Sequence, residues 1–153
     1  MSEHPVAAAI PGAVLASSDY RGQASLEIDP ARIVEVCRFL RDQAQFERLS
    51  AVTGVDWYPD EPRFEVVYLL HSIARNERLR LKCRLPGEAP AIDSVTGVWP
   101  GANWYEREVF DMFGIVFRNH PDPRRILMPE GWEGHPLRKD YPVTGPKYDY
   151  VPE

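Results

Sequence analysis

The hydrophobic pattern of the first half of the chain predicts β-strands joined by short loops. Residues 24–29 (ASLEID) alternate Leu26 and Ile28 with polar neighbours, which is the period of a half-buried strand. Three further runs rich in apolar and β-branched residues are expected to be strands: 46–57, 64–71 and 79–85. The loops between these three runs are too short for a parallel return, which needs about a dozen residues, so we expect antiparallel pairing.

The first predicted helix runs from Pro30 to about Gln43. Asp29 supplies an N-cap oxygen, and Pro30 suits the first helical position because its missing N–H would have no partner there. Apolar residues recur at helical spacing and form a stripe that is expected to cover one face of the sheet. They are Ile33, Val36, Cys37, Leu40 and Ala44.

A second helix is predicted from Asn103, after an apolar segment at 92–99 that ends in Pro100-Gly101. Asn103 stands three residues before Glu106, which is the spacing of a capping box, in which each side chain accepts from the other residue's N–H. Gly114 suits the left-handed position that ends a helix.

The charged residues of this second helix are not all expected to face water. Arg107, Glu108 and Asp111 share one polar face with Trp104, whereas Glu106 falls within the apolar arc. A buried carboxylate needs a partner, which the capping box or an arginine from further along the chain could supply.

Residues 119–153 are predicted to be an extended arm. Seven of these thirty-five residues are proline, so neither a helix nor a central strand can persist there. The arm also has too many apolar and aromatic residues for a solvated tail: Ile126, Leu127, Met128, Trp132, Leu137, Tyr141, Tyr148 and Tyr150. We therefore expect it to become ordered on the surface of another protein.

The elements together predict an α+β fold. Residues 24–118 form one domain, a mixed and mostly antiparallel sheet covered by two helices, which suits a chain of 153 residues. Residues 1–23 lack periodicity and are expected to be a flexible lead. Residues 119–153 follow as the extended, proline-rich C-terminal arm.

Charge and hydropathy narrow the classes of partner. A net charge of −5 and a pI near 5.4 argue against a general nucleic-acid surface. No window approaches the ~20 apolar residues of a membrane span. The apolar run near the N-terminus lacks the basic residues that open a signal peptide. We expect a cytoplasmic location, with any membrane contact made through a partner.

The sequence predicts that the chain carries no cofactor. Cys37 and Cys83 are far apart and belong to no metal-ligand spacing, whereas an iron–sulfur cluster takes four cysteines. Glu106, Glu108, Asp111, His120 and His135 could in principle form an acid–base or metal site, which leaves a stand-alone hydrolase as a distant alternative. Their spacing favours structural roles, because Glu106 and Asp111 lie about 140° apart around a helix.

Basic and aromatic residues of the arm are candidates for partner binding. Arginine, tryptophan and tyrosine are enriched at the centres of protein interfaces. An acidic groove on a partner is therefore the expected site for the basic pairs of the arm, with the aromatic residues between them. The candidates are Arg124, Arg125, Trp132, His135, Arg138, Lys139 and Tyr141.

A run of motifs carries a resemblance to a known family. The motifs are Glu106-Arg107-Glu108, Asp111-Met-Phe-Gly-Ile115, Phe117, His120-Pro121-Asp122, Arg124-Arg-Ile-Leu127 and Gly134-His-Pro-Leu-Arg-Lys-Asp-Tyr-Pro142. Over residues 24–150 the chain resembles the C-type subunit of bacterial type I NADH–quinone oxidoreductase, the thirty-kilodalton-type subunit of respiratory complex I. Pro123 stands where that pattern usually has leucine and Pro129 where it has aspartate, and both changes stiffen the arm.

The resemblance implies a subunit without a redox centre in the peripheral arm of a proton-pumping complex, on the cytoplasmic side of the membrane. It implies contact with the D-type quinone-site subunit and proximity to the cluster-bearing B- and I-type subunits. NADH, FMN, iron–sulfur clusters and quinone would belong to the complex, and this chain would not be catalytic. Related subunits of membrane-bound hydrogenase and formate-hydrogenlyase complexes are the alternative within the resemblance. Asn103, Glu106, Arg107, Glu108, Asp111, Gly114 and His120 would form a structural motif.

Overall fold

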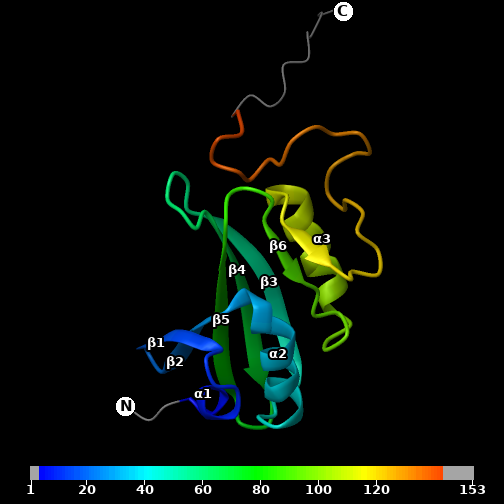
Figure 1. The fold of residues 1–153 in the computed structure, drawn as a ribbon. Helices are drawn as coiled ribbons and strands as arrows, with labels where there is room; N and C mark the ends of the chain where they lie inside the picture. Colours follow the sequence, from blue (N-terminus) through cyan, green and yellow to red (C-terminus); the bar gives the residue numbers. More distant parts are fainter. Residues whose placement is uncertain (1–3, 143–153) are drawn as a thin grey trace, which may run out of the picture.

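The computed structural model describes residues 4–142 and contains a mixed five-stranded sheet (Figure 1). The strand order is β1-β2-β5-β4-β3, in which β2 and β5 are parallel and the other neighbours antiparallel. The strands are β1 (Val14–Tyr20), β2 (Gln23–Ile28), β3 (Arg48–Asp56), β4 (Phe64–Ser72) and β5 (Glu77–Leu85). The α+β fold and the antiparallel pairing of β3, β4 and β5 are confirmed.

Alternate residues of the sheet form the core beneath the helices. Asp29 caps a 3₁₀ turn, η1 (Pro30–Arg32), by accepting from the Ala31 N–H at 3.0 Å, and α2 (Ile33–Asp42) follows directly. The predicted stripe of α2 is buried against the inward residues of β4 and β5, and α3 lies on the same side of the sheet (Figure 1). The hydrophobic stripe of α2 therefore predicted the covered face correctly.

The prediction of a flexible lead is wrong for residues 5–20. Residues Pro5–Ala9 form α1, which packs on α2, and Val6, Ile10 and Ala13 are buried in the core. Strand β1 then pairs with β2 along its whole length. The pattern gave no signal because α1 is a single short turn, and β1 is an edge strand whose side chains are almost all exposed.

Helix α3 (Ala102–Phe113) connects two short strands that pair in parallel, β6 (Ala91–Asp93) and β7 (Val116–Arg118). Its end is as predicted, because Gly114 has φ of +76°. The helix packs closely on β3 at Gly54, where an added Cβ would lie 2.8 Å from the Phe113 ring. A side chain at position 54 would therefore push α3 away from the sheet.

The predicted capping box at Asn103 does not form. Gly101 already has helical dihedral angles, so the helix begins at Ala102 and Asn103 lies inside its first turn. A residue within a helix cannot hold the extended conformation of an N-cap. The Asn103 Oδ1 is buried without a hydrogen-bond partner, and the Glu106 carboxylate turns to a different segment.

The described part of the arm, residues 119–142, has no helix or strand and runs beside α3 (Figure 1). Residues 143–153, which include the predicted anchors Tyr148 and Tyr150, lie outside the described residues. Within residues 4–142, no helix combines the length and the apolar character that crossing a membrane requires.

The buried N-terminal segment can be tested with Ile10→Ala. Ile10 is 5% exposed, so the free energy of unfolding should fall by about 2–4 kcal/mol, measured by urea denaturation. Leu15→Ala is the matched control on the exposed edge strand, where Leu15 is 59% exposed, and should change the value by less than about 0.5 kcal/mol. Equal effects of the two variants would show that the segment is not part of the core.

Candidate functional site

The carboxylate of Asp111, completely buried on α3, organises the start of the arm. Its Oδ2 accepts three consecutive backbone N–H groups, from Ile126 at 3.1 Å, Leu127 at 2.7 Å and Met128 at 2.9 Å. The Arg125 guanidinium donates to Oδ1. Burial alone would raise the pKa of Asp111, but Arg125 and the three N–H groups outweigh burial and hold it below its ordinary value.

Arg125 also fixes the path of the following residues. Its Nη1 donates to the carbonyl of Trp132, and its Nη2 donates to the carbonyl of Gly134 at 2.6 Å. The planar guanidinium has five donors in fixed directions, so it can bind one carboxylate and several carbonyls together. Asp111 and Arg125 thus fold residues 125–134 into a loop against α3.

The arm satisfies the open carbonyls at the end of α3. The last carbonyls of a helix have no partner within it and carry partial negative charge. Here Asp111 O accepts from Arg125 at 3.1 Å and lies 3.0 Å from His135 Nδ1. Met112 O accepts from the Leu137 N–H at 3.0 Å, and Phe113 O accepts from Arg138 Nε at 2.6 Å.

A second polar cluster attaches the far part of the arm to the sheet. Arg63, beside β4, binds both oxygens of Asp56 at 2.8 Å and reaches Asp140 of the arm, also at 2.8 Å. Asp56 accepts the Lys139 N–H at 2.8 Å as well. The Arg63 guanidinium is the largest of the causes that hold the pKa of Asp56 far below its ordinary value.

Arg107 completes the attachment between α3 and the arm. Its Nε donates to the carbonyl of Arg124 at 2.9 Å and its Nη2 to that of Arg125 at 3.0 Å. Asp122 binds Arg124 at 2.6 Å and lies 3.7 Å from Arg107. The polar face that helical spacing predicted is therefore covered by the chain's own arm at Arg107 and Asp111, whereas Glu108 and Trp104 remain exposed.

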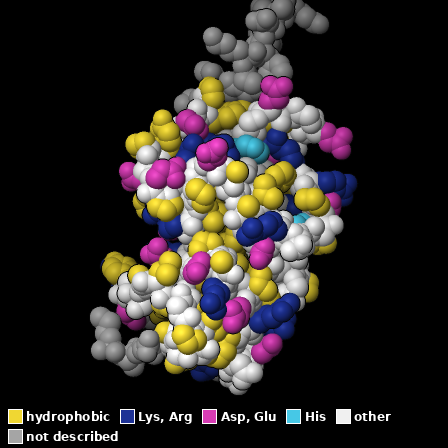
Figure 2. Space-filling view, in the orientation of Figure 1, with side chains coloured by type: hydrophobic (Ala, Val, Ile, Leu, Met, Phe, Trp, Pro, Cys, Tyr) yellow, Lys and Arg dark blue, Asp and Glu magenta, His cyan; other side chains and the backbone are white. Residues whose placement is uncertain are grey.

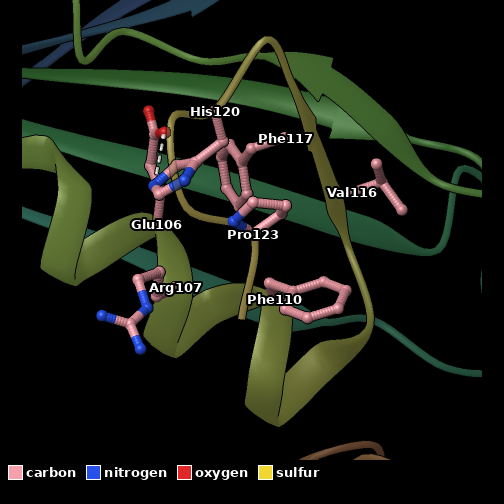
Figure 3. Close-up of a pocket in the computed structure, with 7 residues that line it drawn as sticks. All are labelled: Glu106, Arg107, Phe110, Val116, Phe117, His120 and Pro123. Carbon is pink, nitrogen blue, oxygen red and sulfur yellow. Dashed lines mark ion pairs between the residues drawn. The ribbon is translucent and has the colours of Figure 1, made fainter. Parts of the chain in front are cut away.

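Glu106 is fully buried and has neither of the partners that were expected. Its carboxylate accepts from Ser94 Oγ at 2.6 Å and from the Val95 N–H at 2.7 Å, both in the loop after β6. His120 approaches it, with Nε2 at 3.9 Å from Oε2 (Figure 3). Burial raises the pKa of Glu106 to about 7, against the lowering effect of Ser94 and Val95.

Both ring nitrogens of His120 lie within hydrogen-bond distance of backbone groups. Its Nδ1 accepts the Asp122 N–H at 2.9 Å, so the ring proton lies on Nε2, 3.2 Å from the Asn103 carbonyl. A cavity of about 30 Å³ lies beside the pair and has room for a water molecule. Figure 3 shows its lining: Glu106, Arg107, Phe110, Val116, Phe117, His120 and Pro123.

The arrangement does not favour the metal or acid–base site that was kept as an alternative. Glu106 binds the loop after β6, while Asp111 binds the arm, so the two carboxylates serve different segments. Among residues 4–142, no three His, Cys, Asp or Glu side chains come together as a candidate metal site. His135, in the arm, contacts the Asp111 carbonyl at the end of α3, and His120 is fixed by backbone groups.

The candidate partner-binding residues fall into three groups. Arg125, His135 and Arg138 bind the chain's own α3, so the arm has a site on its own domain, contrary to the expectation that only another protein orders it. Trp132 and Tyr141 are half-buried, and the Tyr141 ring lies over Gly134, at 2.8 Å from the position of an added Cβ. Arg124 and Lys139 are exposed. Partner binding by this set stays a prediction.

Sequence reasoning missed the Arg63 cluster and two aromatic residues beside it. Trp57 and Tyr58 are 41% and 47% exposed in the loop between β3 and β4. The signal for the cluster was present, because Asp56 and Arg63 are opposite charges at the two ends of that loop. Nothing in the pattern indicated that Asp140, in the arm, would join them.

Comparison with known families shows to which protein family the chain belongs. Residues 26–147, most of the chain, match the family described as the 30 kDa subunit of respiratory-chain NADH dehydrogenase. The chain belongs to this family. The resemblance noted in the motifs is thereby confirmed, and because a member of the family is one subunit of a multi-subunit enzyme, other subunits of that enzyme are its partners.

Relatives of this 30 kDa-type subunit include the C-type subunit of NADH-quinone oxidoreductase from Roseiflexus sp. (strain RS-1), which is 54% identical over 138 residues, covering 89% of this chain and 79% of the relative. The C-type subunit from Geobacter sulfurreducens is 48% identical over 134 residues, or 87% of this chain and 83% of the relative.

Solved structures share the fold. A trypsin-resistant fragment (1–134) of Nqo5 is 34% identical, with a TM-score of 0.65 over 70% of this chain and 88% of that one. A chain of an archaeal membrane-bound sulfane sulfur reductase has a TM-score of 0.75 over 90% of this chain and 82% of that one. Its identity is 24%, so that likeness concerns the fold alone.

The buried carboxylate of the 30 kDa-type subunit can be tested with Asp111→Asn. The amide cannot accept three N–H groups and pair with Arg125 as well, so unfolding should become easier by about 2–4 kcal/mol. Trypsin should then cut faster after Arg124 and Arg125. The contribution of Asp111 is present above its unfolded pKa of about 4 and is lost as the pH falls through its lower folded value.

Asp42→Asn is the matched control for this variant. Asp42 also binds an arginine, Arg41 at 2.7 Å, but on the exposed side of α2. It should leave both the unfolding midpoint and the rate of trypsin cleavage nearly unchanged. If Asp111→Asn behaves like Asp42→Asn, the buried carboxylate does not hold the arm.

A pH-dependent effect is expected for Glu106→Gln. The folded-state pKa of about 7 lies above the unfolded value. The contribution of Glu106 to the free energy of unfolding is therefore complete below about pH 4.5 and is lost as pH rises through 7. Relative to wild type, the glutamine variant should gain about 2–3 kcal/mol in free energy of unfolding between pH 5 and pH 8. Glu108→Gln, an exposed change on the same helix, should show no such gain. Parallel pH curves for wild type and Glu106→Gln would contradict the assignment.

Proposed function

We propose that the chain is a cofactor-free docking subunit of proton-pumping NADH–quinone oxidoreductase. In this proposal its arm and α3 bind the D-type quinone-site subunit, close to the cluster-bearing B- and I-type subunits. The chain does not itself catalyse electron transfer. NADH, FMN, iron–sulfur clusters and quinone are bound by other subunits of the complex, which holds this chain at the cytoplasmic face of the membrane.

The observation that carries the proposal is a set of exposed apolar side chains on a firmly attached arm. Leu127 is 56% exposed, Leu137 54% and Trp104, on the adjoining helix, 61%. Apolar side chains stand among charged ones over this part of the surface (Figure 2). Exposed apolar groups on an ordered segment are typical anchors of protein interfaces.

The attachment of the arm supports docking on physical grounds. The Asp111 and Arg63 clusters fix residues 125–140 without help from a partner, while Leu127 and Leu137 remain turned outward. Binding through a pre-ordered segment avoids most of the entropy cost of ordering a loop. The arm is therefore suited to tight association, although it lacks regular secondary structure.

The cysteines support the absence of a bound cofactor. Cys37 on α2 and Cys83 on β5 are completely buried, and burial raises the pKa of both thiols well above the ordinary value. A thiol that stays protonated is a poor metal ligand, since the thiolate is the binding form. These residues behave as core residues.

The names of relatives near 50% identity favour complex I over a hydrogenase-type complex. Both the Roseiflexus and the Geobacter relatives are NADH-quinone oxidoreductase subunits. Subunits of membrane-bound hydrogenase or formate-hydrogenlyase complexes remain the alternative assignment. Co-purification of the chain from its host separates the two, because the partner subunits differ.

The docking surface can be tested with Leu127→Asp and Leu137→Asp. A buried charge opposite an apolar pocket should cost about 2 kcal/mol or more, so that affinity for the D-type subunit falls at least about 30-fold. The measurement is titration of the purified D-type subunit by each variant. Circular dichroism should show that both variants remain folded.

Leu15→Asp is the matched control, because Leu15 is 59% exposed but lies on β1, away from the arm. It should bind the D-type subunit as wild type does. Unchanged affinity of the two arm variants would refute docking through the arm. Absence of the chain from the purified complex would refute the proposed function as a whole.

A further inference from the structure

One face of the sheet carries none of the three helices. The inward residues of β4 and β5 lie under α1, α2 and α3, which all pack on the same side. Alternate residues of each strand point to the opposite face, where the loop between β3 and β4 reaches Arg84 through the Pro62 carbonyl and the Trp57 ring. We call this surface, formed by the outward residues of β1 to β5, the open face.

A row of basic side chains runs along the middle of the open face. Strand β5 is the central strand, and its buried residues Leu79, Leu81, Cys83 and Leu85 alternate with Arg78, Arg80, Lys82 and Arg84. Because side chains alternate across a strand, these four basic residues point to the same side. They gather positive charge on one surface of a chain whose net charge is −5.

The row is only partly neutralised by its neighbours. The outward residues that pair with it on β4 are Glu65, Val67, Leu69 and His71, and those on β2 are Ser25 and Glu27. Among the described residues, none of Arg78, Arg80 and Lys82 has a carboxylate within 4.0 Å. By contrast, Arg63, Arg107 and Arg125 are all ion-paired.

The two sides of the basic row differ in character. Toward β4 and β3 the pairs are Leu69 with Ala51 and Val67 with Thr53, and Val67 is only 7% exposed. Toward β1 there is a shallow hollow of about 100 Å³, lined by Ala16, Ser17, Ser18, Ser25, Glu27 and Lys82. The open face thus offers a line of positive charge, with the partly exposed Leu69 on one side and the polar hollow on the other.

We propose that the open face binds an acidic, amphipathic segment of another subunit of the complex. Carboxylates of that segment pair with Arg80 and Lys82, and its apolar side chains pack on Leu69, which is partly exposed beside Arg80. Arg84 binds the Pro62 carbonyl of its own chain. The other three basic side chains form a line without ion pairs among the described residues, and such a line complements a negatively charged partner. The inference rests on the proposed function, since it assumes that the chain is a subunit of a larger assembly.

The chain's composition allows a direct test at Lys82. The chain has only three lysines, at positions 82, 139 and 147, because arginine supplies fifteen of its eighteen basic residues. A carbodiimide joins an amine to a carboxylate that is in contact with it and adds no spacer. We expect treatment of the intact complex, followed by mass spectrometry, to give an amide between Lys82 and an Asp or Glu of another subunit.

Lys82→Arg is the matched variant, because it keeps the charge and removes the amine. The complex should still assemble, and the crosslink at position 82 should disappear. In the isolated chain the crosslink should be absent, apart from any link to Glu27 of the same chain. Two results together would show that the open face has no such partner. Lys82 in the intact complex would link only to Glu27, and acetylation of Lys82 would be as fast in the complex as in the isolated chain.

A charge reversal provides an independent measurement. Arg80→Glu should lower the salt concentration at which the chain dissociates from the complex, whereas Arg38→Glu, an exposed arginine on the opposite, helical side, should not. Equal behaviour of the two variants would overturn the proposal. A second outcome would also overturn it. In that outcome Lys82 in the intact complex is protected from acetylation but forms no crosslink, and the isolated chain binds phosphatidylglycerol vesicles. Lipid would then be the occupant of the open face. In each case the chain still co-purifies with the complex, so the proposed function stands.

Discussion

The buried carboxylate of Asp111 is the interaction on which the rest of this structure depends. An ionised group in the interior is stable only when several donors surround it. Asp111 obtains them from the arm, through Arg125 and three successive N–H groups. The helix therefore needs the arm to satisfy its charge, and the arm needs the helix for its shape. Neither part is an independent unit.

The arm also supplies hydrogen-bond donors to the end of α3. A helix leaves its last carbonyls open, and solvent or a cap normally satisfies them. In this chain the carbonyls of residues 111–113 bind Arg125, His135, Leu137 and Arg138 of the arm. Proline limits the conformations of the unfolded arm, and the polar contacts with α3 stabilise one of the remaining conformations. An irregular segment thus acquires a defined surface.

The sequence predicted the elements whose periodicity is strong and failed where a partner lies far along the chain. Burial of one face imposes a regular spacing of apolar residues, and this spacing is visible at Leu26 and Ile28 of β2 and at Ile33 and Val36 of α2. Helical spacing correctly grouped Asp111 with Arg107, but it says nothing of what covers their face. The capping box at Asn103 failed because the backbone had already become helical at Gly101. The short helix at Pro5–Ala9 offers too few residues for any repeat to show.

The Arg63 cluster has a consequence for the order in which the chain matures. It joins residues 77 and 83 positions apart, Arg63 with Asp140 and Asp56 with Lys139. Contacts between such distant positions form late, since a long loop must close first. During synthesis, the sheet and α2 leave the ribosome well before residue 140. A growing chain therefore holds a nearly complete domain whose outward anchors are not yet in place, which delays assembly until residue 140 has been synthesised.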